Sequence, residues 1–306
     1  MSNEFRRVSL LGAPTDVGAG RPGASMGPQA MRVAGLRAAL ERQGVAVEDL
    51  GDLAGPGNPQ GEAEAGYRHL SQVQAWATAL RDAVHAELRR GRLPVTLGGD
   101  HSLAIGSIGA VARHCREAGR PLRVIWLDAH ADFNTPATSP TGNLHGMPVA
   151  CLCGLGPDSL VSMAGMVPAL AAQEIRQIGV RSVDAQEKQL VRDAGVEIYD
   201  MRHLDEVGMR ATMEQALRDV RPDVHLHVSF DVDFLDPEIA PGVPTAVRGG
   251  PTYREAQLCM EMLADTGCLG SLDVVELNPA LDVRNRTAEL VVDLLESLFG
   301  KSTLIR

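Results

Sequence analysis

"LRVIWLDAHADFNT", residues 122–135, changes from apolar to polar within a few positions. Its first six residues are rich in β-branched and large apolar side chains, which predicts a buried strand. Asp128, His130 and Asp132 follow at once. The stretch therefore predicts a strand that ends at a group of chemically active side chains.

The rest of the chain alternates in the same way. Apolar runs predict strands at residues 7–12, 45–50, 93–97, 122–127, 175–180, 196–199, 224–232 and 270–277. Helical patterns lie between most of them, at residues 28–42, 64–90, 102–117, 185–194, 203–219, 253–265 and 285–299. This alternation favours an α/β fold with a mostly parallel sheet and helices on both faces. Residues 133–172 lack clear periodicity and predict a long, functional loop with one helix at most.

Composition limits the function classes. The 306 residues, 44% of them hydrophobic, are enough for one large α/β domain or two ordinary ones. A net charge of −10 argues against nucleic acid or an anionic membrane surface as partner, and suits a small cationic substrate. The opening residues 1–14 have too short an apolar run for a signal peptide, and no stretch reaches the ~18 apolar residues of a membrane span. A cytoplasmic protein is expected.

Five cysteines are few for this length and odd in number, which is typical of reduced thiols. Cys151 and Cys153 form a CxC pair, but no second pair accompanies it. Buried free thiols are therefore predicted there, in preference to a metal site.

Three polar clusters follow predicted strands: GGDHS (98–102), DAHADFN (128–134) and SFDVDFLDP (229–237). In an open parallel sheet, ligands bind outside the carboxyl ends of the strands, where such clusters meet. Carboxylate and imidazole donors without a thiolate suit Mn²⁺ or a similar divalent ion. The candidate metal ligands are His101, Asp128, His130, Asp132, Asp231 and Asp233.

The spacing of these residues bears on the number of ions. Asp128 and Asp132 would lie ~13 Å apart on an extended strand, too far for one ion. The chain must bend after Ala129, or the site must be wide, or both. Two ions ~3.5–4 Å apart with shared carboxylates would use all six donors. His225 and His227 share a face with Asp231 but lie further back, so we expect packed or hydrogen-bonded sheet histidines there.

These motifs, with GNLHGMP (142–148), TYRE (252–255) and VVELNP (274–279), resemble the arginase family of binuclear manganese ureohydrolases. The resemblance runs in order from about residue 8 to the C-terminus. It implies a single catalytic domain over residues 1–306 with an eight-stranded parallel sheet between two helical layers. It also implies a homotrimer or homohexamer with two Mn²⁺ per subunit.

The resemblance further implies a role for each site residue. His101 and Asp132 would hold one Mn²⁺, His130 and Asp233 the other, with Asp128 and Asp231 bridging both. A hydroxide between the ions would attack the guanidinium carbon. The implied catalytic residues are Asp132 as proton acceptor, Glu276 as guanidinium partner and His145 as proton shuttle to the leaving amine.

The implied substrate is L-arginine, with L-ornithine and urea as products. Asn134, Thr141 and Asn143 match positions that bind the α-carboxylate, and Asp184 matches one that meets the α-ammonium. Glu187 and Thr245 complete the implied pocket. Asp184 and Glu187 also fit a helix-capping box. Pro244 and Arg248 stand where the family usually has other residues, so Thr245 is expected to be displaced if the loop shifts.

Other interpretations remain open from sequence. The enzyme could hydrolyse another guanidino compound, as an agmatinase or guanidinobutyrase. A single-zinc deacetylase-like amidohydrolase would need an adjacent pair of histidines, which the chain lacks, and a metal-binding regulator would have no need of His145 and Glu276. GAGRPG (18–23) matches a dinucleotide-binding pattern, but PTDV precedes it and Pro22 interrupts it. This loop is expected at the mouth of the active site or at a subunit contact.

Overall fold

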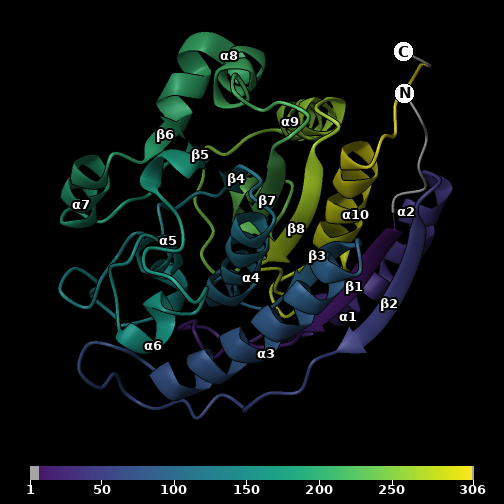
Figure 1. Ribbon diagram of the computed structural model, residues 1–306. Coiled ribbons are helices and arrows are strands. Elements are labelled where there is room, and N and C mark those ends of the chain that lie inside the picture. Colours follow the sequence, from purple (N-terminus) through teal and green to yellow (C-terminus); the bar gives the residue numbers. More distant parts are fainter. Residues whose placement is uncertain (1–6, 305–306) are drawn as a thin grey trace.

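The computed structural model describes residues 7–304 (Figure 1). Outside this range lie residues 1–6 and residues 305–306. Residues 1–6 begin the N-terminal segment for which no signal peptide is expected. Within residues 7–304, eight parallel strands form one sheet in the order β2-β1-β3-β8-β7-β4-β5-β6. The strands are β1 (Arg7–Ala13), β2 (Ala46–Asp52), β3 (Leu93–Gly98), β4 (Leu122–Leu127), β5 (Ile175–Val180), β6 (Glu197–Asp200), β7 (His225–Asp231) and β8 (Leu269–Val275).

Helices cover both faces of this sheet. The helices are α1 (Gly27–Val33), α2 (Leu36–Arg42), α3 (Leu70–Arg89), α4 (Ala104–Glu117), α5 (Pro148–Leu152), α6 (Asp158–Val161), α7 (Glu187–Ala194), α8 (Met201–Ala216), α9 (Tyr253–Asp265) and α10 (Arg286–Leu298). One apolar core joins the sheet to α1, α2, α8, α9 and α10, and a second joins it to α3 to α7. The predicted three-layer α/β fold is confirmed.

Strand β7 shows how the sequence pattern directs side chains to the two faces. Leu226, Val228 and Phe230 pack into the first core. On the opposite face His225 and His227 are buried and both contact the Ser271 hydroxyl, at 2.9 and 2.8 Å. The two histidines are therefore hydrogen-bonded sheet residues, as their distance from the strand end predicts.

Three predicted helices differ from the structure at backbone positions that cannot continue a helix. The predicted helix 28–42 is divided into α1 and α2, because Gly35 turns the chain in a left-handed conformation (φ 83°). The predicted helix 64–90 begins only at Leu70, after His69 with φ 56°. The predicted helix 203–219 is α8, which is kinked at Gly208. The loop 133–172 contains α5, α6 and the 3₁₀ turn η3 (Leu144–Gly146), where one helix was expected, and a second 3₁₀ turn, η4 (Ala172–Glu174), begins at its last residue.

All five cysteines are free thiols in this structure, as predicted, but Cys153 is only partly buried where a buried thiol was predicted. Burial raises the pKa of Cys115, Cys151, Cys153 and Cys259 to about 12 in each case. In the part of the chain that the structure describes, no helix has the length and apolar character needed to cross a bilayer.

Candidate active site

The central strands β3, β8, β7 and β4 are neighbours, and their carboxyl ends supply the candidate site. His101 follows β3, Glu276 follows β8 and Asp128 follows β4, while Asp231 ends β7 and Asp233 lies in the 3₁₀ turn directly after it. Parallel strands place all these ends at the same edge of the sheet. Residues far apart in sequence therefore meet there.

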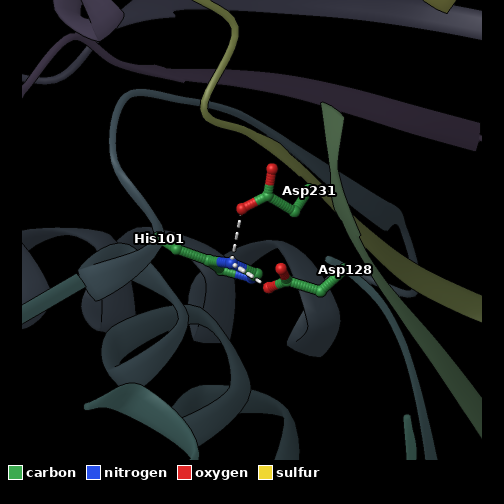
Figure 2. Close-up of side chains that lie close together, drawn as sticks. All are labelled: His101, Asp128 and Asp231. Carbon is green, nitrogen blue, oxygen red and sulfur yellow. Dashed lines mark hydrogen bonds and ion pairs between the residues drawn. The ribbon is translucent and has the colours of Figure 1, made fainter. Parts of the chain in front are cut away.

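One group of donors surrounds the imidazole of His101 (Figure 2). Its Nδ1 lies 3.1 Å from Asp128 Oδ2, 3.1 Å from Asp132 Oδ2 and 3.0 Å from Asp231 Oδ2. A ring nitrogen can donate to one acceptor only, so three carboxylates around one point are better suited to a cation. The donor set fits a hard divalent ion.

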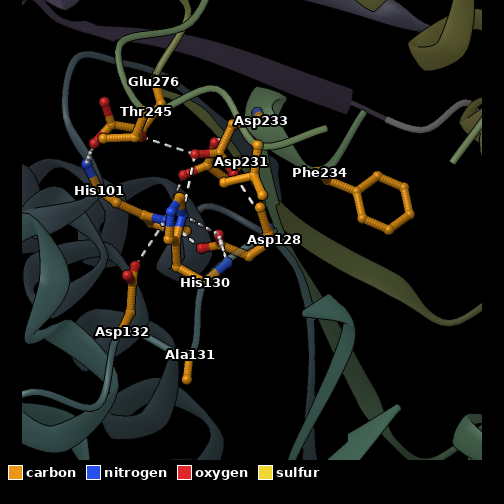
Figure 3. Close-up of polar contacts among 12 residues, drawn as sticks. His101, Asp128, His130, Ala131, Asp132, Asp231, Asp233, Phe234, Thr245 and Glu276 are labelled. Carbon is orange, nitrogen blue, oxygen red and sulfur yellow. Dashed lines mark hydrogen bonds and ion pairs between the residues drawn. The ribbon is translucent and has the colours of Figure 1, made fainter. Parts of the chain in front are cut away.

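A second group surrounds His130, whose Nδ1 lies 3.4 Å from Asp128 Oδ1 and 3.2 Å from Asp233 Oδ2. Potential ligand atoms of Asp128, His130 and Asp233 all lie within 4.8 Å of one another, as do those of His101, Asp128 and Asp231. Asp128 belongs to both groups. The structure thus brings the six predicted ligands together in two adjoining groups (Figure 3).

A bend makes this arrangement possible. Strand β4 ends at Leu127, and Asp132 takes a left-handed conformation with φ 51°. This conformation is uncommon for a residue other than glycine and persists where neighbours hold it. Asp132 O accepts from Val149 N at 3.0 Å, and Phe133 N donates to Glu187 Oε1 at 2.8 Å. The extended ~13 Å separation of Asp128 from Asp132 is therefore not realised.

Several groups behind the candidate ligands orient them. Trp126 Nε1 donates to Asp128 Oδ2 at 2.9 Å, and its indole stacks on the His101 ring at 4.1 Å. His101 Nε2 lies 2.9 Å from Ser229 Oγ, so Nδ1 is the nitrogen that faces the carboxylates. Ala129 N donates to Asp233 Oδ1 at 3.1 Å. Such contacts hold ligands in place before a metal binds.

The electrostatics of this cluster call for added positive charge. Asp128, Asp132, Asp231 and Asp233 are all buried. Burial and the Asp128 charge raise the pKa of Asp132 to about 7. Burial alone lowers the pKa of His130, but Asp233 and Asp128 outweigh it and raise that pKa to about 12. Without metal, protons must balance the carboxylates, and divalent ions would supply the same charge.

Glu276 connects the candidate metal-ligand groups to His145. Its Oε1 accepts from His101 N at 2.9 Å and contacts His145 Nδ1 at 3.0 Å. Its Oε2 is buried and has no hydrogen-bond partner among residues 7–304. Glu276 also has a left-handed backbone (φ 62°), held by the donation of Glu276 N to Gly99 O. A buried unpaired carboxylate oxygen beside the cluster is suited to a donor-rich ligand.

These residues open into a pocket of about 310 Å³. The lining includes every residue predicted to act in catalysis or to bind substrate: Asn134, Thr141, Asn143, His145, Asp132, Asp184, Glu187, Thr245 and Glu276. Asn134 Nδ2 donates to Asp184 Oδ2 at 3.0 Å. The Oδ1 atoms of Asn134 and Asn143 are buried and find no partner in the described part of the chain. The pocket therefore presents several unpaired acceptors.

Glu187 has its carboxylate committed to the backbone. Oε1 accepts from Phe133 N and Oε2 accepts from Asp184 N, at 2.8 and 3.0 Å. The capping box that Asp184 and Glu187 could have formed is incomplete, because α7 begins at Glu187 after Gln186 and has no side-chain cap. Glu187 instead joins the loop after β4 to the loop after β5.

The loops at residues 242–250 and 18–23 both bear on the pocket, the first by lining it and the second by contacting residues that line it. Thr245 remains there despite Pro244, and its hydroxyl donates to Asp233 Oδ2 at 2.9 Å. Displacement of Thr245 away from the pocket is therefore not observed. The GAGRPG loop lies at the mouth: Gly18 O accepts from His145 N at 3.0 Å, and a Cβ on Gly20 would come within 2.6 Å of Asn143.

Comparison with known proteins agrees with this geometry. The arginase family model matches residues 6–300. The chain belongs to the arginase family. It is 45% identical to an arginase of Bacillus caldovelox, over 98% of this chain and all of that one, and 45% identical to an arginase of Agrobacterium fabrum, over 99% and 94%. The crystal structure of the B. caldovelox arginase superposes with a TM-score of 0.92 at 43% identity, over 98% of this chain and 100% of that chain.

Sequence reasoning missed the residues that support this arginase-family site. Asp100, Ser229 and Trp126 stand beside or within the quoted motifs, so their positions could have drawn attention. Arg181 has no such signal, yet its guanidinium donates to the carbonyls of Asp233, Phe234, Leu235 and Val247. Its importance follows only from where the loops meet.

One prediction concerns the pKa of His145 in the metal-free protein. Burial opposes the imidazolium, but the contact with Glu276 outweighs it and raises the pKa to about 9. An NMR titration of the His145 ring should show this value, and Glu276→Gln should move it toward the ordinary ~6.5. Titration near 6.5 in the unaltered protein would contradict the pairing.

The pairing of His145 with Glu276 also makes the stability of the metal-free protein depend on pH. Because the folded-state pKa is raised, the pairing stabilises the metal-free fold fully below about pH 6.5 and is lost as the pH rises through about 9. The difference in unfolding midpoint between Glu276→Gln and the unaltered protein should therefore shrink over that interval.

Proposed function

We propose that this protein is a metal-dependent hydrolase that converts L-arginine and water to L-ornithine and urea. The observation that carries the proposal is the unpaired Oε2 of Glu276, buried at the pocket beside the ligand groups. A guanidinium has only donors, is planar and is permanently charged, so it satisfies this oxygen without introducing a new unpaired acceptor. Arginase-family membership supports the same substrate.

The metal requirement is proposed as two Mn²⁺ per subunit. His101 and Asp132 would hold one ion and His130 and Asp233 the other, while Asp128 and Asp231 would bridge them. The membership of Asp128 in both donor groups supports this division, and the hard oxygen and imidazole donors suit Mn²⁺. When bound, two such ions lower the pKa of a water so that it can attack near neutral pH, and they stabilise charge on the tetrahedral carbon centre.

The chain's own residues would then orient substrate and move protons. Glu276 Oε2 holds the guanidinium so that its carbon faces the attacking water. Asp132 accepts the proton that remains on the oxygen after attack. His145 delivers a proton to Nε of arginine as the bond between Nε and the guanidinium carbon breaks. Nε becomes the δ-amino group of ornithine, and urea is released. In the metal-free protein the Glu276 contact raises the pKa of His145 to about 9, and the same contact orients the ring for the task.

The mouth of the pocket would bind the amino-acid end of the substrate. Thr141 and Asn143 offer a hydroxyl and an amide to the α-carboxylate, and Asp184 offers a carboxylate to the α-ammonium. Asn134 was expected at the α-carboxylate, but its Nδ2 donates to Asp184 and its free Oδ1 is an acceptor, so here it suits the ammonium instead. Glu187 acts by holding Asp184 and Phe133, and Thr245 by holding Asp233. Polar recognition of this kind selects strongly against substrates that lack the group.

We also propose one catalytic domain over residues 1–306, assembly as a homotrimer or homohexamer, and a cytoplasmic location. The arginase resemblance supports the first two. Five free thiols support a reducing compartment.

Replacing a proposed ligand tests the metal site. His101→Asn should weaken binding of one Mn²⁺ by at least about tenfold and lower activity. Its circular dichroism spectrum should remain that of the folded protein. His225→Asn is the matched control, since His225 is an equally buried histidine bonded to Ser271. It should keep two ions by elemental analysis. An unchanged metal count in His101→Asn would remove His101 from the ligand set.

Substrate comparison tests the activity itself. The Mn²⁺-loaded protein should release urea from L-arginine with a kcat/KM at least about 100-fold above those for agmatine and 4-guanidinobutyrate. A preference for either of those would make the protein an agmatinase or guanidinobutyrase. One zinc per chain with no urea from any of the three would favour the deacetylase-like alternative.

Asn143→Asp tests the carboxylate contact. The added charge should repel the α-carboxylate and raise the KM for arginine about tenfold, or about 1.4 kcal/mol. The internal control is product inhibition: the Ki of ornithine should rise, whereas that of 1,4-diaminobutane, which lacks a carboxylate, should not. Equal behaviour of the two inhibitors would place Asn143 outside the carboxylate site.

A further inference from the structure

His145 is held at two points. Its imidazole Nδ1 lies 3.0 Å from Glu276 Oε1, and its backbone N–H donates to Gly18 O at 3.0 Å. The first contact orients the ring, and the second sets the position of the backbone. His145 lies in η3, which spans only Leu144–Gly146. A single 3₁₀ turn has little stability of its own, so these tertiary contacts determine where the imidazole lies.

Gly18 is itself held by Asp100, a fully buried residue of the GGDHS motif. Gly18 N donates to Asp100 Oδ2 at 2.9 Å, and Ser102 N donates to Asp100 Oδ1 at 3.0 Å. One carboxylate oxygen therefore serves the loop that carries His101, and the other serves the loop that contacts His145. Gly18 relays the second contact, since its own N–H donates to Asp100 and its own carbonyl oxygen accepts from His145 N.

The linked contacts of Asp100 with Gly18 and of Gly18 with His145, here called the Gly18 joint, have little freedom because they are closely packed. A Cβ on Gly18 would come within 2.4 Å of Asp100 Oδ1 and 2.5 Å of Ser102 Oγ. The backbone next to Asp100 is equally constrained: Asp100 N donates to Thr15 O, and Gly99 O accepts from Glu276 N. The end of β3 thus connects to both residues that hold His145, namely Gly18 and Glu276.

We propose that Asp100 is a positioning residue for His145 and acts through Gly18. The inference rests on the proposed function, in which His145 protonates the leaving amine. The competing role for Asp100 is confined to its N-cap contact with Ser102, through which it would place His101 alone. The two roles differ in what they change, since one affects proton delivery and the other affects metal binding.

Asp100→Asn separates them. Ser102 N and Gly18 N donate to different oxygens of Asp100, and an amide keeps only one of those oxygens, so the variant replaces one of the two acceptors by an N–H donor. We expect kcat to fall about 10- to 100-fold, because small displacements of a catalytic group cost that much. KM for arginine and the Mn²⁺ count should stay within about twofold. Loss of a metal ion with a normal kcat after reloading, or an unchanged kcat, would overturn the proposal.

Gly18→Ala disturbs the same joint from the other side. If Asp100 acts through Gly18, the double variant should lose little more kcat than the more impaired single variant, because both changes break one path. Independent effects that multiply would contradict the relay. Asp16→Asn is the matched control: Asp16 holds the same loop further out, at Gly23 and Asn58, and the change should leave kcat within about twofold.

Hydrogen exchange distinguishes failure of this inference from failure of the proposed function. Exchange of the His145 amide reports its bond to Gly18 O whether or not arginine is a substrate. It should accelerate in Asp100→Asn and in Gly18→Ala, and remain unchanged in Asp16→Asn. If the unaltered protein releases no urea, accelerated exchange still supports the joint, and unchanged exchange in both variants refutes it.

Discussion

Four buried carboxylates at one edge of the sheet are the constraint on which the rest of the site depends. Asp128, Asp132, Asp231 and Asp233 would repel one another unless positive charge and donors surround them. Two imidazoles, an indole N–H, a threonine hydroxyl and backbone amides meet this demand. The same groups orient the carboxylates, so the donor geometry is largely set by the protein itself. Divalent ions would supply the positive charge that still has to balance the four carboxylates.

Backbone strain accompanies this chemistry. Asp132 and Glu276, both proposed to act in catalysis, have left-handed backbones (φ 51° and 62°). Such residues cost roughly 1–3 kcal/mol each and persist only where surrounding contacts determine them. Asp132 is held through Val149 and Phe133, and Glu276 through Gly99. The contacts at the strand ends hold these two residues in the strained conformation. They thereby place both carboxylates where a residue with an extended backbone could not place them.

Much of this could be predicted. Each of the eight predicted strands lies within two residues of an observed one at either end, since apolar β-branched runs are a local signal. The six candidate ligands also come together, because parallel strands end at a common edge. The helix boundaries at Gly35 and His69 were wrong in prediction, since a continuing helical pattern does not reveal a left-handed backbone. The use of both Glu187 oxygens by backbone amides was equally hidden, because it depends on two loops meeting.

By itself, the sequence determined the α/β class, the strand ends that carry the chemistry and the types of donor, because periodicity and residue type act locally. The tertiary structure alone decided how those donors are shared. It placed Asp128 in both ligand groups, and it joined Glu276 to His101 and His145, which lie 175 and 131 residues away. It also connected Asp100 to His145 through a glycine of the first loop. Such contacts depend on strand order and on single backbone angles, and no local pattern specifies either.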